Sequence, residues 1–171
     1  MSNASNKFVI AVYVDNHFGV LTRVTSMFTR RGFNIDALTV GETESSEYSR
    51  ITISLSGDSY AREQLINQMK KLFNVKKVEV LVDSECIKRE LMLIKVKNEK
   101  EHRPDIQFAV DAYRAKVVDY TSEAMCIEVT GDPTKIDAFV QLMKPFGIIE
   151  MCRTGIVAIE RGSETMFSQE V

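Results

Sequence analysis

Residues 8–35 read FVIAVYVDNHFGVLTRVTSMFTRRGFNI. Within this stretch, the spacing of the apolar residues changes from one typical of a strand to one typical of a helix. Its first part, residues 8–15, is rich in β-branched and aromatic side chains and predicts a strand. The turn Asn16–Gly19 follows. The remainder predicts an amphipathic helix over residues 20–31, which Gly32 closes in a left-handed conformation.

The helix prediction depends on the spacing of its apolar residues, which recur every three or four positions and so form one stripe along a helix. We expect this stripe to face the core of the domain. Its members are Leu21, Val24 and Phe28, widened by Val20 and Met27.

The residues that follow complete a six-element pattern. Strands are predicted at residues 34–40, 48–56 and 75–82, and a second helix at residues 60–73. The order is β-α-β-β-α-β, which is the split βαβ or ferredoxin-like arrangement.

The second half of the chain repeats this order. Strands are predicted at residues 90–97, 116–120, 125–129 and 148–153, further extended residues at 156–160, and helices at residues 104–115 and from Asp132–Pro133 to about Pro145. The stretch ITISLSGD at 51–58 also resembles CIEVTGD at 126–132, which indicates a duplication.

We therefore predict an α+β protein of two tandem ferredoxin-like βαββαβ units. The first domain should span residues 7–83 and the second residues 88–162. Residues 163–171 are polar at most positions, and we expect them to form a flexible tail.

Composition excludes several classes of protein. The formal net charge of −2 attracts neither nucleic acid nor an anionic membrane surface. No apolar run approaches the roughly 20 residues that a membrane-spanning helix needs, and the polar N-terminus lacks the apolar segment of a signal peptide. Cys86, Cys126 and Cys152 are an odd number of widely spaced cysteines, which favours free thiols in a cytoplasmic protein.

No pattern of catalytic or metal-binding residues stands out. His17 and His102 lack the spacing of a metal motif, and the cysteines fit inert positions in strands better than reactive ones. The acidic loop of Glu42, Glu44 and Glu47 could hold a hard cation weakly, but no EF-hand-like spacing organises it, and we expect no metal site. We therefore expect no catalysis by this chain.

RNA binding is another function to consider, because RNA-recognition modules share this fold class. The tripeptide Arg31-Gly32-Phe33 echoes their basic-glycine-aromatic motif. It falls at a predicted helix end and not in a central strand, and no run of exposed aromatic residues follows. We expect no nucleic-acid partner.

The turn between the first strand and the first helix is the candidate binding site. A helix start leaves backbone N–H groups unpaired and carries a positive dipole, so it can hold a carboxylate. Gly19 permits a close approach of the backbone, and Asn16 and Asn34 each offer a donor and an acceptor. The alternative is purely structural: Asn16 caps the helix, and Gly19 eases the turn.

Several stretches resemble the small, regulatory subunit of acetolactate synthase (acetohydroxyacid synthase). The resemblance spans about residues 7–162, and its ordered set of motifs is specific, although a lone N-x-x-G-x-L would not be. The matching stretches are N-x-x-G-x-L from Asn16, S-x-F-x-x-R-G-F-N-I from Ser26, S-R-I-T-I from Ser49, R-E-L-M-L-I-K-V from Arg89, G-D-P-T-K-I-D-A-F from Gly131 and R-T-G-I-V-A-I-E-R-G from Arg153.

This resemblance implies a regulatory protein whose N-terminal domain is an ACT domain. Such subunits form homodimers through their ACT domains, and valine or a related branched-chain amino acid binds at the dimer interface. By similarity, Asn16, Gly19 and Val20 of one chain would face the effector, together with Asn34 and Ile35 of the neighbouring chain.

The resemblance also implies a partner, the catalytic large subunit. That subunit carries thiamine diphosphate, magnesium and FAD, and condenses two pyruvates, or pyruvate with 2-oxobutyrate. The small subunit raises its activity and transmits feedback inhibition in branched-chain amino acid biosynthesis. Coupling of this kind requires an effector that favours one assembly state over another.

This chain departs from the family within the turn, where Phe18 is bulky and His17 adds a group that can titrate near neutral pH. Both residues bear on which effector binds. The alternative functions are a stand-alone ACT-type amino-acid sensor with another partner, and a small self-sufficient enzyme. A sensor of this kind usually carries a DNA-binding segment, and an enzyme needs a nucleophile–base set. The sequence shows neither feature.

Overall fold

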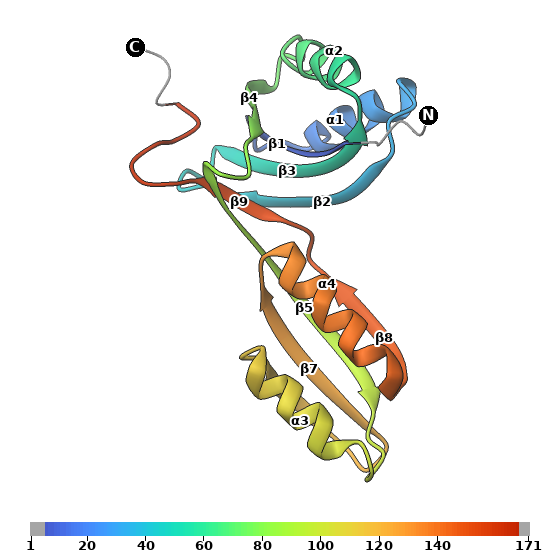
Figure 1. The fold of residues 1–171 in the computed structure, drawn as a ribbon. Helices are drawn as coiled ribbons and strands as arrows, with labels where there is room; N and C mark the ends of the chain where they lie inside the picture. Colours follow the sequence, from blue (N-terminus) through green and yellow to red (C-terminus); the bar gives the residue numbers. More distant parts are fainter. Residues whose placement is uncertain (1–5, 168–171) are drawn as a thin grey trace. The chain divides into compact units, whose positions relative to one another are not determined.

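The structure is a computed structural model that describes residues 6–167. Figure 1 follows the chain through its helices and strands. The chain divides into two compact units, one of residues up to 87 together with those from 156 onward, and one of residues 88–155. Within the described residues, no helix is long and apolar enough to cross a membrane.

The first unit is an antiparallel sheet with two helices, as the sequence predicts. Its sheet has the order β2-β3-β1-β4, which is the ferredoxin-like order. The elements are β1 (Asn6–Asp15), α1 (Val20–Arg30), β2 (Ile35–Glu42), β3 (Tyr48–Gly57), α2 (Ser59–Met69) and β4 (Val75–Leu81). In Figure 1 both helices lie over the same face of this sheet.

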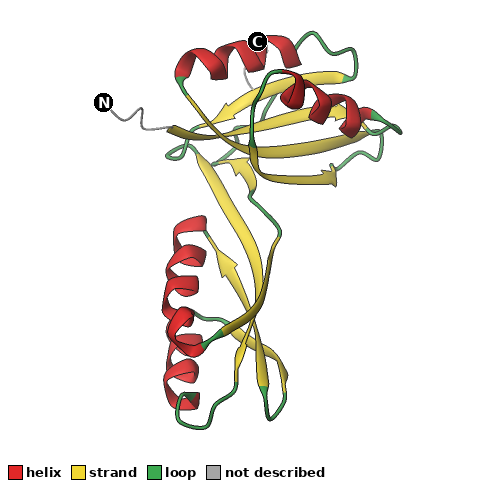
Figure 2. Ribbon diagram, turned by 90° about the vertical axis from the view of Figure 1, so that its right-hand side faces the viewer, coloured by secondary structure: helices red, strands yellow, loops and turns green. Residues whose placement is uncertain are grey.

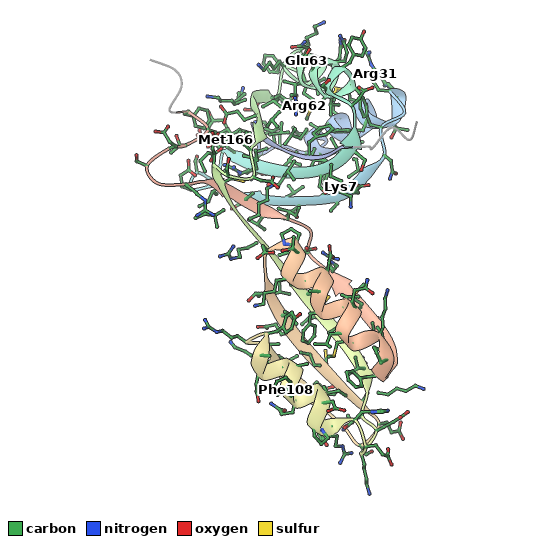
Figure 3. All side chains as sticks on the ribbon, viewed as in Figure 1. Lys7, Arg31, Arg62, Glu63, Phe108 and Met166 are labelled. Atoms are coloured by element: carbon green, nitrogen blue, oxygen red, sulfur yellow. The ribbon has the colours of Figure 1, made fainter. Side chains whose placement is uncertain are left out.

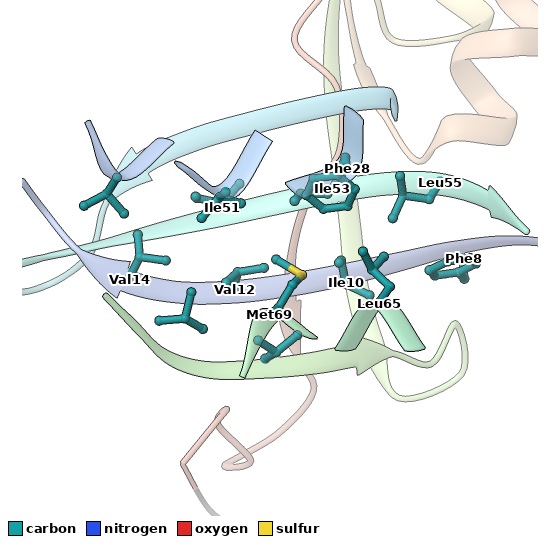
Figure 4. Packing of buried hydrophobic residues seen from close by; sticks show 14 residues of the cluster. Phe8, Ile10, Val12, Val14, Phe28, Ile51, Ile53, Leu55, Leu65 and Met69 are labelled. Atoms are coloured by element: carbon teal, nitrogen blue, oxygen red, sulfur yellow. The ribbon is translucent and has the colours of Figure 1, made fainter. Parts of the chain in front are cut away.

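The core of the first unit lies between that face and the helices. Side chains alternate along a strand, so every second residue of β1 points into this core. Ile10, Val12 and Val14 do so, and they pack against Ile51 and Ile53 of β3 (Figure 4). The register Ile10↔Ile53 and Val12↔Ile51 places these residues side by side across the sheet.

Helix α1 buries a narrower stripe than its spacing predicts. Val20, Val24 and Phe28 are buried, whereas Leu21 is 40% exposed. The buried positions are four residues apart, so the stripe follows the i, i+4 ridge, and Leu21 lies beside it on the exposed side. The prediction that Leu21 faces the core is wrong.

The end of α1 confirms the prediction for Gly32, which has φ +70°. Its N–H donates to the carbonyl of Thr29 at 3.2 Å, and the N–H of Phe33 donates to that of Phe28 at 3.1 Å. These two hydrogen bonds form a Schellman motif, in which the residue after the helix must be left-handed. Phe33 packs against the core beside Phe28.

The second unit repeats the same topology, with a sheet of the order β6-β7-β5-β8 and both helices on one face (Figure 2). Residues such as Ile94, Ile127 and Phe139 form a separate core. Its elements are β5 (Cys86–Lys97), α3 (Arg103–Ala112), β6 (Lys116–Tyr120), β7 (Ala124–Gly131), α4 (Pro133–Met143), the 3₁₀ turn η1 (Lys144–Phe146) and β8 (Ile148–Arg153).

The last strand, β9 (Val157–Glu160), belongs to the first unit. With the residues after it, β9 covers the face of the first sheet that the helices leave open. Ala158 and Met166, both 2% exposed, pack there against Val9, Ala11 and Tyr13. Figure 3 labels Met166 in this position.

The compact units of the structure differ from the expected domains at their C-terminal end. Residues 156–162 group with the first unit, although β9 also pairs with β5, and residues 163–167 are no loose tail, because Met166 is buried. The physical reason is that β1 is apolar on both faces, so its second face needs a cover. Residues 168–171 lie outside the described residues.

The cysteines occupy three different environments. Cys86 is buried, Cys126 is half-buried and Cys152 is exposed, and these three cysteines are not in disulfides. This agrees with the prediction that the three cysteines do not form a disulfide framework. Their positions in strands, however, leave Cys126 partly exposed and Cys152 exposed.

Candidate functional site

The turn before α1 holds the candidate site. Gly19 is the N-cap of α1 with φ +83°, and no described side chain caps this helix. By contrast, Asp58 caps α2 and Asp132 caps α4. The first N–H groups of a helix have no partner inside it. The start of α1 is therefore a helix end without a side-chain cap and with a positive dipole.

Asn16 has a different role from the capping that its position allows. Its Nδ2 donates to Glu42 Oε1 at 3.2 Å and to the carbonyl of Ser46 at 3.0 Å. Its backbone N–H donates to the carbonyl of Glu47 at 2.7 Å. Asn16 thus attaches the turn to the β2–β3 hairpin, and the carbonyl oxygen of its side chain stays available as an acceptor.

Two apolar side chains frame the turn. Phe18 is fully exposed and Leu21 is 40% exposed, whereas the side chain of Val20 is buried in the core. A ligand at this turn would therefore meet the backbone of Val20 and not its side chain. The apolar contact falls instead to Leu21, which the sequence places in the core. The apolar residues Val20, Val24 and Phe28 are spaced four positions apart, and this spacing would have indicated from the sequence that Val20 is buried and Leu21 is exposed.

A groove of about 750 Å³ opens beside the turn, between α1 and α2. Phe18 and Gly19 line one part of this groove. Among the described residues, its lining includes Arg23, Arg30 and Lys71 but no carboxylate. The surroundings of the turn are therefore positively charged on this side, which favours an anionic group.

Asn34 and Ile35 lie at the other end of α1. Asn34 is exposed in the loop after the helix, and Ile35 is half-buried at the start of β2. A helix of 11 residues is about 16 Å long, so one chain does not bring these residues to the turn. The structure of one chain thus separates the five expected site residues into two groups.

The acidic loop takes part in protein contacts. Glu42 accepts from Asn16, and Glu44 Oε1 accepts from the hydroxyl of Tyr13 at 3.4 Å. Among residues 6–167, no group of three or more His, Cys, Asp or Glu side chains is placed to hold a metal ion.

Comparison with known proteins agrees with this architecture. A family model described as "AHAS small subunit-like ACT domain" matches residues 10–77, and one described as "Small subunit of acetolactate synthase" matches residues 89–162. The acetolactate synthase small subunit of Mycolicibacterium smegmatis is 43% identical over 162 residues, covering 95% of each chain. That of Aquifex aeolicus is 43% identical over 156 residues, which cover 91% of this chain and 81% of the relative.

A solved structure supports the same assignment. The crystal structure of the acetolactate synthase small subunit from Thermotoga maritima superposes with a TM-score of 0.84 at 37% identity. The match covers 93% of this chain and 99% of that one.

Fold and turn together define a tandem ferredoxin-like protein of the ACT-domain class, a class of regulatory modules. Within that class, this chain belongs to the family of acetolactate synthase small subunits. It is thereby a regulatory subunit and not the catalytic one.

Proposed function

We propose that this chain activates a catalytic acetolactate synthase subunit and makes it sensitive to feedback inhibition by valine or a related branched-chain amino acid. The effector binds between the ACT domains of two copies of the chain. Thiamine diphosphate, magnesium and FAD belong to the catalytic subunit, and the assembled enzyme acts in the cytoplasm.

The observation that carries the proposal is the division of the expected site between the two ends of α1. An amino-acid effector needs an anion site, acceptors for its ammonium group and an apolar surface. The start of α1 supplies N–H groups for the carboxylate. Asn16 and Glu42 supply acceptors, and Leu21 supplies apolar surface. Asn34 and Ile35 can join this site only from a second chain.

Inhibition then follows from linkage. An effector that contacts two chains at once stabilises the one arrangement of the dimer in which both contacts form. If the catalytic subunit is activated by another arrangement, the effector and the activated state oppose each other by a coupling free energy.

Calorimetric titration with valine, leucine and isoleucine tests the site. We expect saturable binding to the wild-type chain, loss of binding in Asn16→Ala, and unchanged binding in Asn67→Ala, an exposed asparagine of α2. No heat with any of the three amino acids would remove the effector role.

A mixture of two variants tests whether the site is shared. Asn16→Ala and Asn34→Ala should each fail to bind alone. After exchange, half of the dimers contain one chain of each kind, and one of their two sites is intact. The mixture should regain about a quarter of the wild-type capacity. A mixture that stays inactive would contradict a site built from two chains.

Assay with the purified catalytic subunit separates this function from that of a stand-alone amino-acid sensor. Addition of the wild-type chain should raise the rate of acetolactate formation, and valine should lower it again. The Asn16→Ala chain should still activate but no longer respond to valine. A sensor with another partner would leave the rate unchanged throughout.

A further inference from the structure

Strand β4 forms one edge of the first sheet, at the opposite end of the order β2-β3-β1-β4 from β2. Figure 4 shows it in green as the outermost strand. No described strand pairs with its outer edge. An unpaired edge is a template for another strand, and natural proteins usually block it.

This edge lies open in a groove of about 690 Å³. Eight consecutive residues, 75–82, line the groove, so it follows the strand along its whole length. Ile66 of α2 and Lys70 just after it also line the groove, as do Glu85, Cys86 and Glu160. The groove has the form that an added strand would occupy.

The lysines of β4 do not block the edge as isolated charges would. Lys76 Nζ lies 3.0 Å from Asp15 Oδ1, and Lys77 Nζ lies 3.4 Å from Glu79 Oε1. Each lysine thus has a carboxylate beside it, which reduces its repulsion of an incoming strand.

The sequence of β4, VKKVEVL, is self-complementary about Val78. In a symmetric antiparallel pairing centred on Val78, Lys77 of each copy faces Glu79 of the other. Opposite charges directly across a strand pair stabilise it, and like charges destabilise it. A pairing centred on Lys77 or on Glu79 would bring two like charges together.

Apolar side chains at the two ends of the strand are exposed. Phe73 before β4 is 84% exposed, and Val82 after it is 48% exposed. In antiparallel pairing about Val78, Val82 of one copy lies opposite Asn74 of the other, which is next to Phe73 in the sequence. The pairing therefore brings exposed apolar residues near one another at each end.

We propose that β4 is a second self-association surface, on which two copies of this chain pair edge to edge about Val78. A two-fold pairing of this kind uses the same patch on both copies. Because β4 and β2 are opposite edges of the sheet, the pairing leaves β2 free. It joins dimers into larger assemblies.

Charge reversal on the full-length chain tests the pairing, with sedimentation velocity over a range of concentrations as the measurement. The wild-type chain should form assemblies larger than the homodimer. Lys77→Glu alone and Glu79→Lys alone should each weaken the association of dimers about tenfold, because each variant places like charges opposite each other across the strand pair. Asp137→Asn, at an exposed residue of α4 in the second unit, should leave it unchanged.

An equal mixture of the two single variants distinguishes pairing between chains from the ion pair within each chain. In a mixed pair, the carboxylate introduced at position 77 of one copy faces the ammonium group introduced at position 79 of the other. The two native side chains at these positions also face each other. Assembly should therefore return, although the internal ion pair stays broken in both chains.

A double variant, Lys77→Glu/Glu79→Lys, keeps the test decisive if a single variant does not fold. It restores opposite charges within the chain and across a pair of identical copies. It should therefore assemble with itself, but it should add no mass to wild-type assemblies, because like charges would then face each other at both positions.

Three results would overturn the proposal. The first is a wild-type chain that never exceeds the homodimer. The second is a mixture that stays as small as its components. The third is loss of binding to the catalytic subunit in the single variants without any change in self-association, because the strand that β4 accepts would then belong to that subunit.

Discussion

Arg153 donates two parallel hydrogen bonds to Glu90, from Nε to Oε1 at 2.8 Å and from Nη2 to Oε2 at 2.6 Å. The two residues are 63 positions apart and join the end of β8 to β5. Glu90 is only 5% exposed. The hydrogen bond to Glu90 is the largest cause that raises the pKa of Arg153, so this contact favours the charged guanidinium.

This pair leads to the first prediction. Arg153→Met leaves the buried carboxylate of Glu90 without its donors and should lower the free energy of unfolding by about 2 kcal/mol. Asp137 accepts from Nη1 of the same arginine at 2.7 Å but is 63% exposed. Asp137→Asn should therefore cost less than about 0.5 kcal/mol. Urea unfolding measures both, and equal losses would contradict the role of burial.

The second prediction concerns the cap of α4. Asp132 Oδ1 accepts from the N–H of Lys135 at 2.9 Å and from the hydroxyl of Thr134. Asp132→Ala should destabilise the chain by about 1 kcal/mol at neutral pH. Urea unfolding gives the value, and an unchanged midpoint would show that this cap contributes nothing.

The same cap should respond to pH. The hydrogen bond from Thr134 and then that from Lys135 lower the pKa of Asp132 below its ordinary value of 3.8. A lowered pKa in the folded state means that the charge adds stability above pH 3.8 and that this stability is lost as pH falls through the folded pKa. The difference between the wild-type chain and Asp132→Asn should be constant from about pH 7 to about pH 5 and shrink on further acidification. A difference that grows on acidification would reverse the assignment.

The third prediction concerns Gly32, whose φ of +70° suits glycine in the Schellman motif. Gly32→Ala should lower stability by about 1 kcal/mol, although a Cβ there would touch nothing within 4 Å. Gly41 is a matched control, since it also has open space but no positive φ. Thermal unfolding should show a loss for Gly32→Ala and none for Gly41→Ala, and equal effects would point away from backbone strain.

The fourth prediction concerns the cover on the second face of β1. Met166→Ala removes a side chain that is 2% exposed and should cost about 2–3 kcal/mol. Met151→Ala, on a methionine of β8 that is 44% exposed, is the control and should cost less than half as much. Denaturant unfolding of both variants is the measurement. If Met166→Ala were silent, the residues after β9 would be the loose tail that their composition suggests.

Predictions from local patterns succeeded where the physical cause is local. The strand at residues 8–15, the left-handed Gly32 and the cap at Asp132 depend on neighbours within a few positions. The family resemblance rested on motifs of the same local kind, and the comparisons confirm it. How an effector binds at Asn16 and Asn34 stays a prediction.

The errors fall where a residue meets a distant partner. Leu21 has the spacing of a core residue, but the position of the sheet under α1 leaves it exposed. The structural alternative, in which Asn16 caps the helix, does not hold, because the β2–β3 hairpin offers its amide two acceptors, 26 and 30 residues away. No window of local sequence contains these partners.

By itself, the sequence determined the order of strands and helices, the duplication and the family, because periodicity, turn residues and motifs are written in short stretches. Only the tertiary structure decided which residues cover the second face of β1. It also brought Arg50 Nη2 of β3 to 3.6 Å from Glu160 Oε2 of β9. Burial of an apolar face requires a cover but does not specify which segment supplies it. The path of the chain makes that choice, and it brings residues 156–167 back to the unit in which the chain begins.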